Sequence, residues 1–169
     1  IARSSGEFAD RKMSDYYLTD IEKANIAKMA ANFENSIVVL NVGGMMDTKF
    51  FAETEGLDSM LLMSQAGMRG GDAVVKVLNG EVTPSGKLTD TWAVNYEDYS
   101  SSETFGVNDG DDTQENYTDD IYVGYRYFDT FNVTPAYEFG YGMSYTDFAM
   151  YVTDVSVDAE NVTVTVRVT

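Results

Sequence analysis

The chain has 169 residues, enough for one domain with a sizeable core. Its 11 Lys and Arg residues against 28 Asp and Glu residues give a net charge of −17, which argues against nucleic acid or an anionic membrane surface as a partner because both would repel it. It has no Cys and no His, which excludes disulfides and thiolate metal sites. Proton transfer near neutral pH therefore falls to a carboxyl group, a lysine or a tyrosine.

No stretch has the length of a membrane span. The apolar runs at 37–40 and 60–63 are far too short to cross a bilayer. No signal peptide is visible, and the compartment stays open because the absence of Cys fits several.

The first eleven residues, Ile1-Ala-Arg-Ser-Ser-Gly-Glu-Phe-Ala-Asp-Arg11, place one carboxylate in a loop of small residues. Glu7 directly follows Gly6, and a glycine lets a ligand approach the backbone closely. The pattern fits a catalytic carboxylate, but it also fits an ordinary solvated turn.

A helix is predicted from residue 19 to about residue 33. Thr19 and Glu22 have the spacing of a capping box, in which each side chain bonds the backbone of the other residue. We expect one side of the helix to be buried through Ile21, Ala24 and the stem of Lys28. Three further apolar residues would lie along its edge: Ile26, Met29 and Phe33.

Two strands and a second helix follow. Residues 37–42 are largely β-branched and apolar, as in a parallel strand that is covered on both faces, and residues 58–63 form a second such strand. Residues 70–79 predict a short helix that stops at Gly80. These elements predict an α/β fold with adjacent, mostly parallel strands and both helices packed on the sheet.

Residues 93–120 form a long polar loop, and such loops are usually functional or mobile. The acidic run at 108–112 has oxygen ligands suited to calcium but lacks EF-hand spacing, so a solvated loop is the preferred interpretation and no metal is expected. Residues 151–157 and 162–168 alternate in polarity around residues 158–161, which predicts a β-hairpin.

Five blocks together carry a resemblance to a known family. They are Asn35-Ser-Ile-Val-Val-Leu-Asn-Val-Gly-Gly44, Gln65-Ala-Gly-Met-Arg-Gly-Gly-Asp-Ala-Val74, Gly80-Glu-Val-Thr-Pro-Ser-Gly-Lys-Leu88, Asp120-Ile-Tyr-Val-Gly-Tyr-Arg-Tyr-Phe-Asp129 and Tyr137-Glu-Phe-Gly-Tyr-Gly-Met-Ser-Tyr-Thr146. In this order they resemble the C-terminal α/β sandwich domain of glycoside hydrolase family 3, which includes β-glucosidases.

The resemblance implies two parts. Residues 1–148 would be that domain, a partial α/β sandwich that lacks its first strands. Residues 149–169 would be the first strands of a fibronectin type III-like domain, and two strands alone are marginal in water.

The resemblance also implies a role for the first loop. In many bacterial members the general acid/base is the Glu of an Arg-x-Ser-Gly-Glu-Gly-x-Asp-Arg loop, which corresponds to Glu7. Phe8 departs from the usual Gly and is a candidate aromatic wall for substrate. Asp10 and Arg11 are expected to support the loop as an ion pair.

The family's nucleophilic Asp lies on a separate TIM-type barrel in a Ser-Asp-Trp-like context. The nearest matches here are Asp15 and Asp90, and neither is expected on a barrel strand. The resemblance therefore implies that the chain supplies the acid/base of a retaining β-glycosidase of the β-glucosidase type, and that it acts with that barrel on a glycoside or oligosaccharide without a cofactor.

Other conspicuous residues have two interpretations. Asp119 and Asp120 are weak candidates to face the active site. Trp92 is expected in the core, and the methionines of 60–63 are expected to pack there. Nine aromatic residues suggest either a sugar-stacking platform or, preferably, a packed hinge between domains: Tyr122, Tyr125, Tyr127, Phe128, Phe131, Tyr137, Phe139, Tyr141 and Tyr145.

A second functional reading is a non-catalytic carbohydrate-binding or scaffold module. A Ser-Asp-Trp-like barrel in the same gene would favour the enzyme.

Overall fold

A computed structural model describes residues 1–3, 11–105, 113 and 117–169. Its elements in chain order are β1 (Ala2–Arg3), α1 (Asp20–Asn32), β2 (Ile37–Val42), α2 (Lys49–Glu53), β3 (Ser59–Leu62), α3 (Gly70–Leu78), β4 (Trp92–Ala93), α4 (Tyr125–Phe131), β5 (Pro135–Tyr137), β6 (Met150–Val157) and β7 (Val162–Val168). Two short 3-10 helices cover Met13–Asp15 and Tyr96–Asp98.

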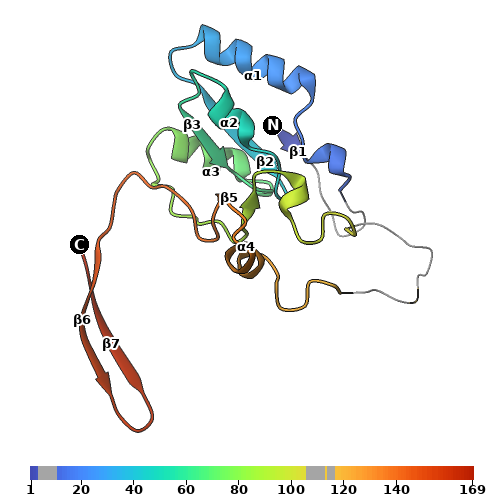
Figure 1. The fold of residues 1–169 in the computed structure, drawn as a ribbon. Coiled ribbons are helices and arrows are strands. Elements are labelled where there is room, and N and C mark those ends of the chain that lie inside the picture. Colours follow the sequence, from blue (N-terminus) through green and yellow to red (C-terminus); the bar gives the residue numbers. More distant parts are fainter. Residues whose placement is uncertain (4–10, 106–112, 114–116) are drawn as a thin grey trace.

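The main sheet is parallel, and its strands lie in the order β1-β2-β3 (Figure 1). Ala2 and Arg3 pair with Asn41 and Val42, and the four residues of β3 pair with residues 37–40 of β2. The predicted parallel pairing of 37–42 with 58–63 is confirmed. α2, which the sequence analysis missed, lies between these two strands in the chain.

The predicted capping box of α1 is present, but the predicted buried side is wrong. Glu22 N donates to Thr19 Oγ1 at 3.3 Å, and Thr19 N donates to Glu22 Oε2 at 2.9 Å. Ile26 and Ala30 are the buried residues, whereas Ile21 is 75% exposed. Alanines are spread around α1 and leave its apolar side poorly defined in the sequence. Contact with the core then selects the side that carries Ile26 and Met29.

The core lies between α1, β2 and the segment around β4. Its buried members form one cluster of Leu18, Ile26, Val38, Leu40, Val42, Met46, Phe50 and Trp92. The expectation that Trp92 belongs to the core is confirmed, since its side chain is 4% exposed. Met60 packs against the cluster from β3, as expected, and so does Leu62, whereas Met63 is not among the residues packed against it.

The prediction that both faces of the sheet are covered is wrong. Val38, Leu40 and Val42 are buried, but Ile37 and Asn41 on the other face of β2 are exposed. α3 matches the predicted helix to within one residue, yet only Gly70 at its start is buried. In the described part of the chain, the core cluster therefore packs on only one face of β2.

Residues 125–131 form a helix that the aromatic pattern did not reveal, and β4 pairs with β5 antiparallel through Trp92 and Tyr137. The predicted hairpin is confirmed as β6 and β7, which project from the rest of the molecule in Figure 1. All residues of both strands are exposed, and a larger fibronectin type III-like unit stays a prediction. Within the described part of the chain, none of the helices has the length and apolar character needed to cross a bilayer.

Candidate functional site

The candidate loop emerges from the carboxyl end of β1. Glu7, Phe8 and Asp10 lie outside the described residues, as does all of 4–10. Its flanks are described: Arg3 ends β1 opposite Val42, the last residue of β2. Ligands of open parallel sheets bind outside the carboxyl ends of the strands, and Arg3, the residue before the segment 4–10, lies at that end of β1.

Arg11 fixes the other flank of this loop. Its Nη1 donates to the carbonyl of Met45, just after β2, at 3.0 Å, and its Nη2 donates to the carbonyl of Asp15 at 2.8 Å. Burial lowers the pKa of Arg11. A side chain on Gly44 would begin 3.2 Å from Nη1, so the glycine leaves room for the guanidinium. The predicted ion pair with Asp10 stays a prediction.

Arg3 makes the densest set of polar contacts near the loop. Its Nη1 and Nη2 donate to the two carboxylate oxygens of Glu22 at 2.6 and 2.7 Å. Its Nε donates to the carbonyl of Asp15 at 3.2 Å, and Nη2 also reaches that of Tyr17 at 3.4 Å. The hydrogen bond from Arg3 lowers the pKa of Glu22 to about 2. The sequence predicts that Glu22 caps α1, but it does not predict the bidentate pair between Arg3 and Glu22.

A group of tyrosines supports the chain directly after the loop. The buried Tyr16 hydroxyl donates to the carbonyl of Ala93 at 3.0 Å, and Tyr99 Oη accepts from Ala93 N at 2.9 Å. The rings of Tyr17, Tyr96 and Tyr99 meet Tyr16 edge to face at 5.1–6.2 Å. Burial raises the pKa of Tyr16 far above its usual value, so this phenol stays protonated and acts as a structural donor.

A hollow of about 540 Å³ opens beside this support. Its lining comes from α1, α2 and residues near their ends: Tyr17, Lys23, Ile26, Ala27, Asp47, Lys49, Phe50, Glu53 and Thr54. Asp47 is a buried carboxylate that the sequence analysis missed, and its Oδ1 accepts from Lys49 N at 2.9 Å. This bond satisfies an early N–H of α2, so Asp47 is explained by the start of that helix.

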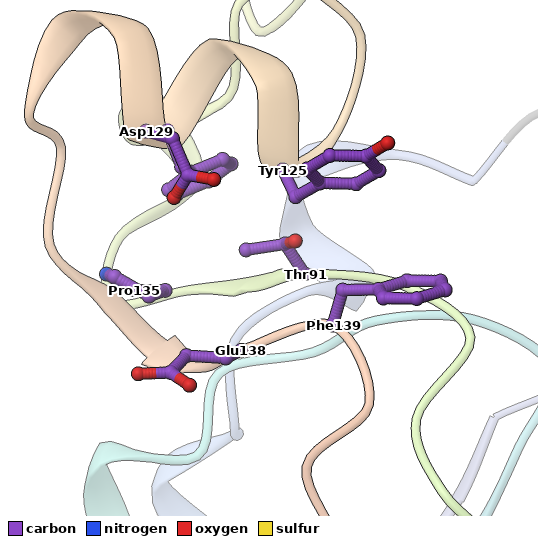
Figure 2. A pocket seen from close by; sticks show the side chains of 7 residues that line it. Thr91, Tyr125, Asp129, Pro135, Glu138 and Phe139 are labelled. Atoms are coloured by element: carbon purple, nitrogen blue, oxygen red, sulfur yellow. The ribbon is translucent and has the colours of Figure 1, made fainter. Parts of the chain in front are cut away.

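A second, smaller pocket of about 180 Å³ lies between α4 and β5, as Figure 2 shows. Tyr125 and Phe139, two of the nine aromatic candidates, line it with Thr91, Asp129 and Glu138. The ring centroids of Tyr125 and Phe139 are 5.5 Å apart, and both residues are about half exposed. The platform and hinge interpretations of the aromatic residues both stay predictions.

The remaining candidates have less definite surroundings. Asp15 belongs to the first 3-10 helix, and Asp90 lies in a bend before β4, so neither is on a strand. Asp119 is partly buried, and its Oδ1 has no hydrogen-bond partner among the residues that the structure describes. Asp120 has a left-handed backbone with φ 50°. The acidic run at 108–112 lies outside the described residues.

Comparisons with known proteins agree on one family. The model of the glycosyl hydrolase family 3 C-terminal domain matches residues 1–145. Beta-glucosidase A of Butyrivibrio fibrisolvens is 47% identical over 139 residues, which are 80% of this chain and 16% of that protein. A beta-glucosidase of Ruminococcus albus is 42% identical over 171 residues, which are 99% of this chain and 17% of that protein.

A solved structure shares the arrangement of the chain. Beta-glucosidase 3B of Thermotoga neapolitana, in complex with glycerol, superposes with a TM-score of 0.88 at 42% identity. The match covers 99% of this chain and 24% of that structure, so the chain spans a quarter or less of the length of these relatives. The chain belongs to glycoside hydrolase family 3, and residues 1–145 correspond to the C-terminal domain of that family.

Proposed function

We propose that the polypeptide containing this chain is a retaining β-glycosidase that hydrolyses terminal β-linked glucose or a related sugar. The observation that carries the proposal concerns the two residues that flank the segment 4–10, which contains Glu7: Arg3 lies at the carboxyl end of β1, and Arg3 and Arg11 both donate to the carbonyl of Asp15. Membership of the family and the β-glucosidase names of the relatives support the same activity.

In this mechanism Glu7 works twice. A carboxylate on the TIM-type barrel attacks the anomeric carbon, while protonated Glu7 gives its proton to the glycosidic oxygen and releases the alcohol. The ionised Glu7 then takes a proton from water, which attacks the glycosyl-enzyme and releases the sugar with retained configuration. Contact with the barrel and its carboxylate would raise the pKa of Glu7, so that it is protonated for the first step.

The test replaces Glu7 with Ala in the full-length polypeptide. We expect kcat/KM for cellobiose to fall about 10²–10⁴-fold, the usual contribution of general acid catalysis, because its leaving group needs protonation. An aryl glucoside with an acidic phenol should keep much of its glycosylation rate. Azide should partly restore turnover and give a β-glycosyl azide, because a small anion can enter the space left by the carboxylate.

Two outcomes would contradict the proposal. Equal loss on all substrates without rescue by azide would move the acid/base away from Glu7, and the next candidates would be the carboxylates within residues 93–120. If the parent polypeptide binds sugar but does not turn it over, the non-catalytic binding module would be favoured.

The proposal also concerns domain organisation. It assigns residues 1–148 to the C-terminal α/β sandwich domain and residues 149–169 to the first strands of a fibronectin type III-like domain. The confirmed antiparallel pairing of β6 with β7 supports the second assignment.

A further inference from the structure

Arg3 connects the chain on both sides of the loop that carries Glu7. It is the last residue before the segment 4–10, yet its guanidinium binds the carbonyls of Asp15 and Tyr17, which follow that segment. The same guanidinium makes the bidentate pair with Glu22 at the start of α1. One side chain therefore fixes the spacing between the start of the loop and the chain beyond its end.

The acceptors that Arg3 uses are themselves held in place. Tyr16 is buried and lies in the chain between Asp15 and Tyr17, whose carbonyls accept from Arg3. Its hydroxyl donates to the carbonyl of Ala93 at 3.0 Å, and its own carbonyl accepts from Asp47 N at 2.9 Å. Glu22 is held in the capping box by Thr19. Arg3 thus joins β1 to groups that are themselves held by further hydrogen bonds.

The guanidinium is also suited to this task by its chemistry. Arginine presents several N–H donors in a fixed plane, which matches a bidentate carboxylate and two carbonyls at once. Lysine has the same charge but no planar fork. The side chains of Arg3 and Glu22 are only 14% and 25% exposed, so water competes weakly for their hydrogen bonds.

We infer that Arg3, through its contacts with Glu22 and the carbonyls of Asp15 and Tyr17, is a positioning residue for the acid/base Glu7. This inference rests on the proposed function. The geometric reason is that a catalytic carboxyl must be held close to the glycosidic oxygen, and a misplacement of about 1 Å can cost about 10²-fold in rate. Arg3 does not touch the substrate in this scheme.

The test is a leaving-group comparison in the full-length polypeptide. Arg3→Lys should lower kcat/KM for cellobiose by about 10- to 100-fold, because protonation of the leaving group needs a correctly placed Glu7. The value for dinitrophenyl β-glucoside should fall by less than about 3-fold, since this phenol leaves without protonation. Glu22→Gln should act in the same direction but less, because the two backbone carbonyls still hold Arg3.

The matched control is Arg69→Lys. Arg69 also pairs with a carboxylate, that of Asp72 at 3.1 Å, but both side chains are mostly exposed and lie at the start of α3. In this variant kcat/KM for both substrates should stay within about 2-fold of the parent value, as expected when an exposed surface pair is changed. Thermal unfolding of each variant shows the fraction that is folded at the assay temperature, and rates are compared at equal folded fraction.

The outcomes separate this inference from the proposed function. If Glu7→Ala shows the leaving-group dependence and both Arg3→Lys and Glu22→Gln lose activity equally on the two substrates, or lose none, then Arg3 is structural only and the inference is wrong. If Glu7→Ala itself shows uniform loss, then the proposed function fails and the inference fails with it. If Glu7→Ala and Arg3→Lys each lose more activity on cellobiose than on dinitrophenyl β-glucoside, and Arg69→Lys does not, then the proposed function and the role of Arg3 are both supported.

Discussion

Strands β2 and β7 have similar compositions but opposite surroundings. Both are rich in valine, and both are paired along their length. β2 lies between two parallel neighbours and buries Val38, Leu40 and Val42 against α1 and the segment around Trp92. β7 pairs only with β6, and its four valines are all exposed. Strand pairing alone therefore does not bury apolar side chains, because burial needs a second packed layer.

The largest expected effect comes from truncating the core side of this comparison. Leu40 is 1% exposed, and Leu40→Ala in the 169-residue chain should lower the free energy of unfolding by about 2–5 kcal/mol through lost burial and a cavity. Urea denaturation can be followed by the fluorescence of Trp92, the only tryptophan in the sequence. Val164→Ala in β7 is the control and should have little effect. Equal cost in the two strands would contradict the difference in packing.

An intermediate effect is expected from the charged pair that joins β1 to α1. The folded-state pKa of Glu22 is lowered from 4.5 to about 2 by the hydrogen bond from Arg3, so its stabilising contribution is fully present above about pH 4.5 and is lost as the pH falls toward 2. Glu22→Gln should lower the free energy of unfolding at pH 7 by about 1–2 kcal/mol, after allowance for screening of a partly exposed pair. The difference from the parent should shrink between pH 4.5 and pH 2.

The control for this pH dependence lies in the hairpin. Hydrogen bonds from the backbone N–H groups of Glu160 and Asn161 lower the pKa of Asp158, but Asp158 is fully exposed in a local turn. Asp158→Asn should leave the unfolding of the core unchanged from pH 7 to pH 2. A similar pH-dependent loss in both variants would show that long-range charge, and not the contact with Arg3, stabilises the fold.

Local signals in the sequence predicted local features correctly. The capping box at Thr19 and Glu22, the strands at 37–42 and 58–63, the helix at residue 70 and the hairpin each depend on neighbours close in the chain. Trp92 was expected in the core because it adjoins a strand-like run.

The remaining features depend on contacts between distant segments. The buried side of α1 is set by contact with β2, and β1 has only two residues, which are too few for a periodic pattern. α4 consists largely of aromatic residues, so its sequence suggested a stacking surface and has no clear helical pattern of apolar and polar residues. Family motifs made Glu7 a candidate, which stays a prediction, whereas the Arg3 contacts join residues 12 to 19 positions apart and leave no periodic signal.

In the 169-residue chain the smallest effects are expected in the exposed hairpin, and the same substitutions in a longer polypeptide test whether both of its faces stay exposed there. Directly opposed residues of β6 and β7 share a face, so the apolar pair of Val155 with Val164 lies on one face of the hairpin and the polar pair of Ser156 with Thr163 lies on the other. In the 169-residue chain, Val164→Thr and Thr163→Val should each change the free energy of unfolding by less than about 0.5 kcal/mol, because both sites are exposed.

If residues 149–169 begin a fibronectin type III-like sandwich, as proposed, further strands cover the valine face, and Val164→Thr in the full-length polypeptide should cost about 1–3 kcal/mol by burying a hydroxyl group. Thr163→Val should stay neutral there, since its face remains in solvent. Hydrogen exchange of the amides of β7 in each variant measures this difference locally. A neutral Val164→Thr in the full-length polypeptide would mean that nothing packs on the valine face, and the proposed second domain would then have to be abandoned.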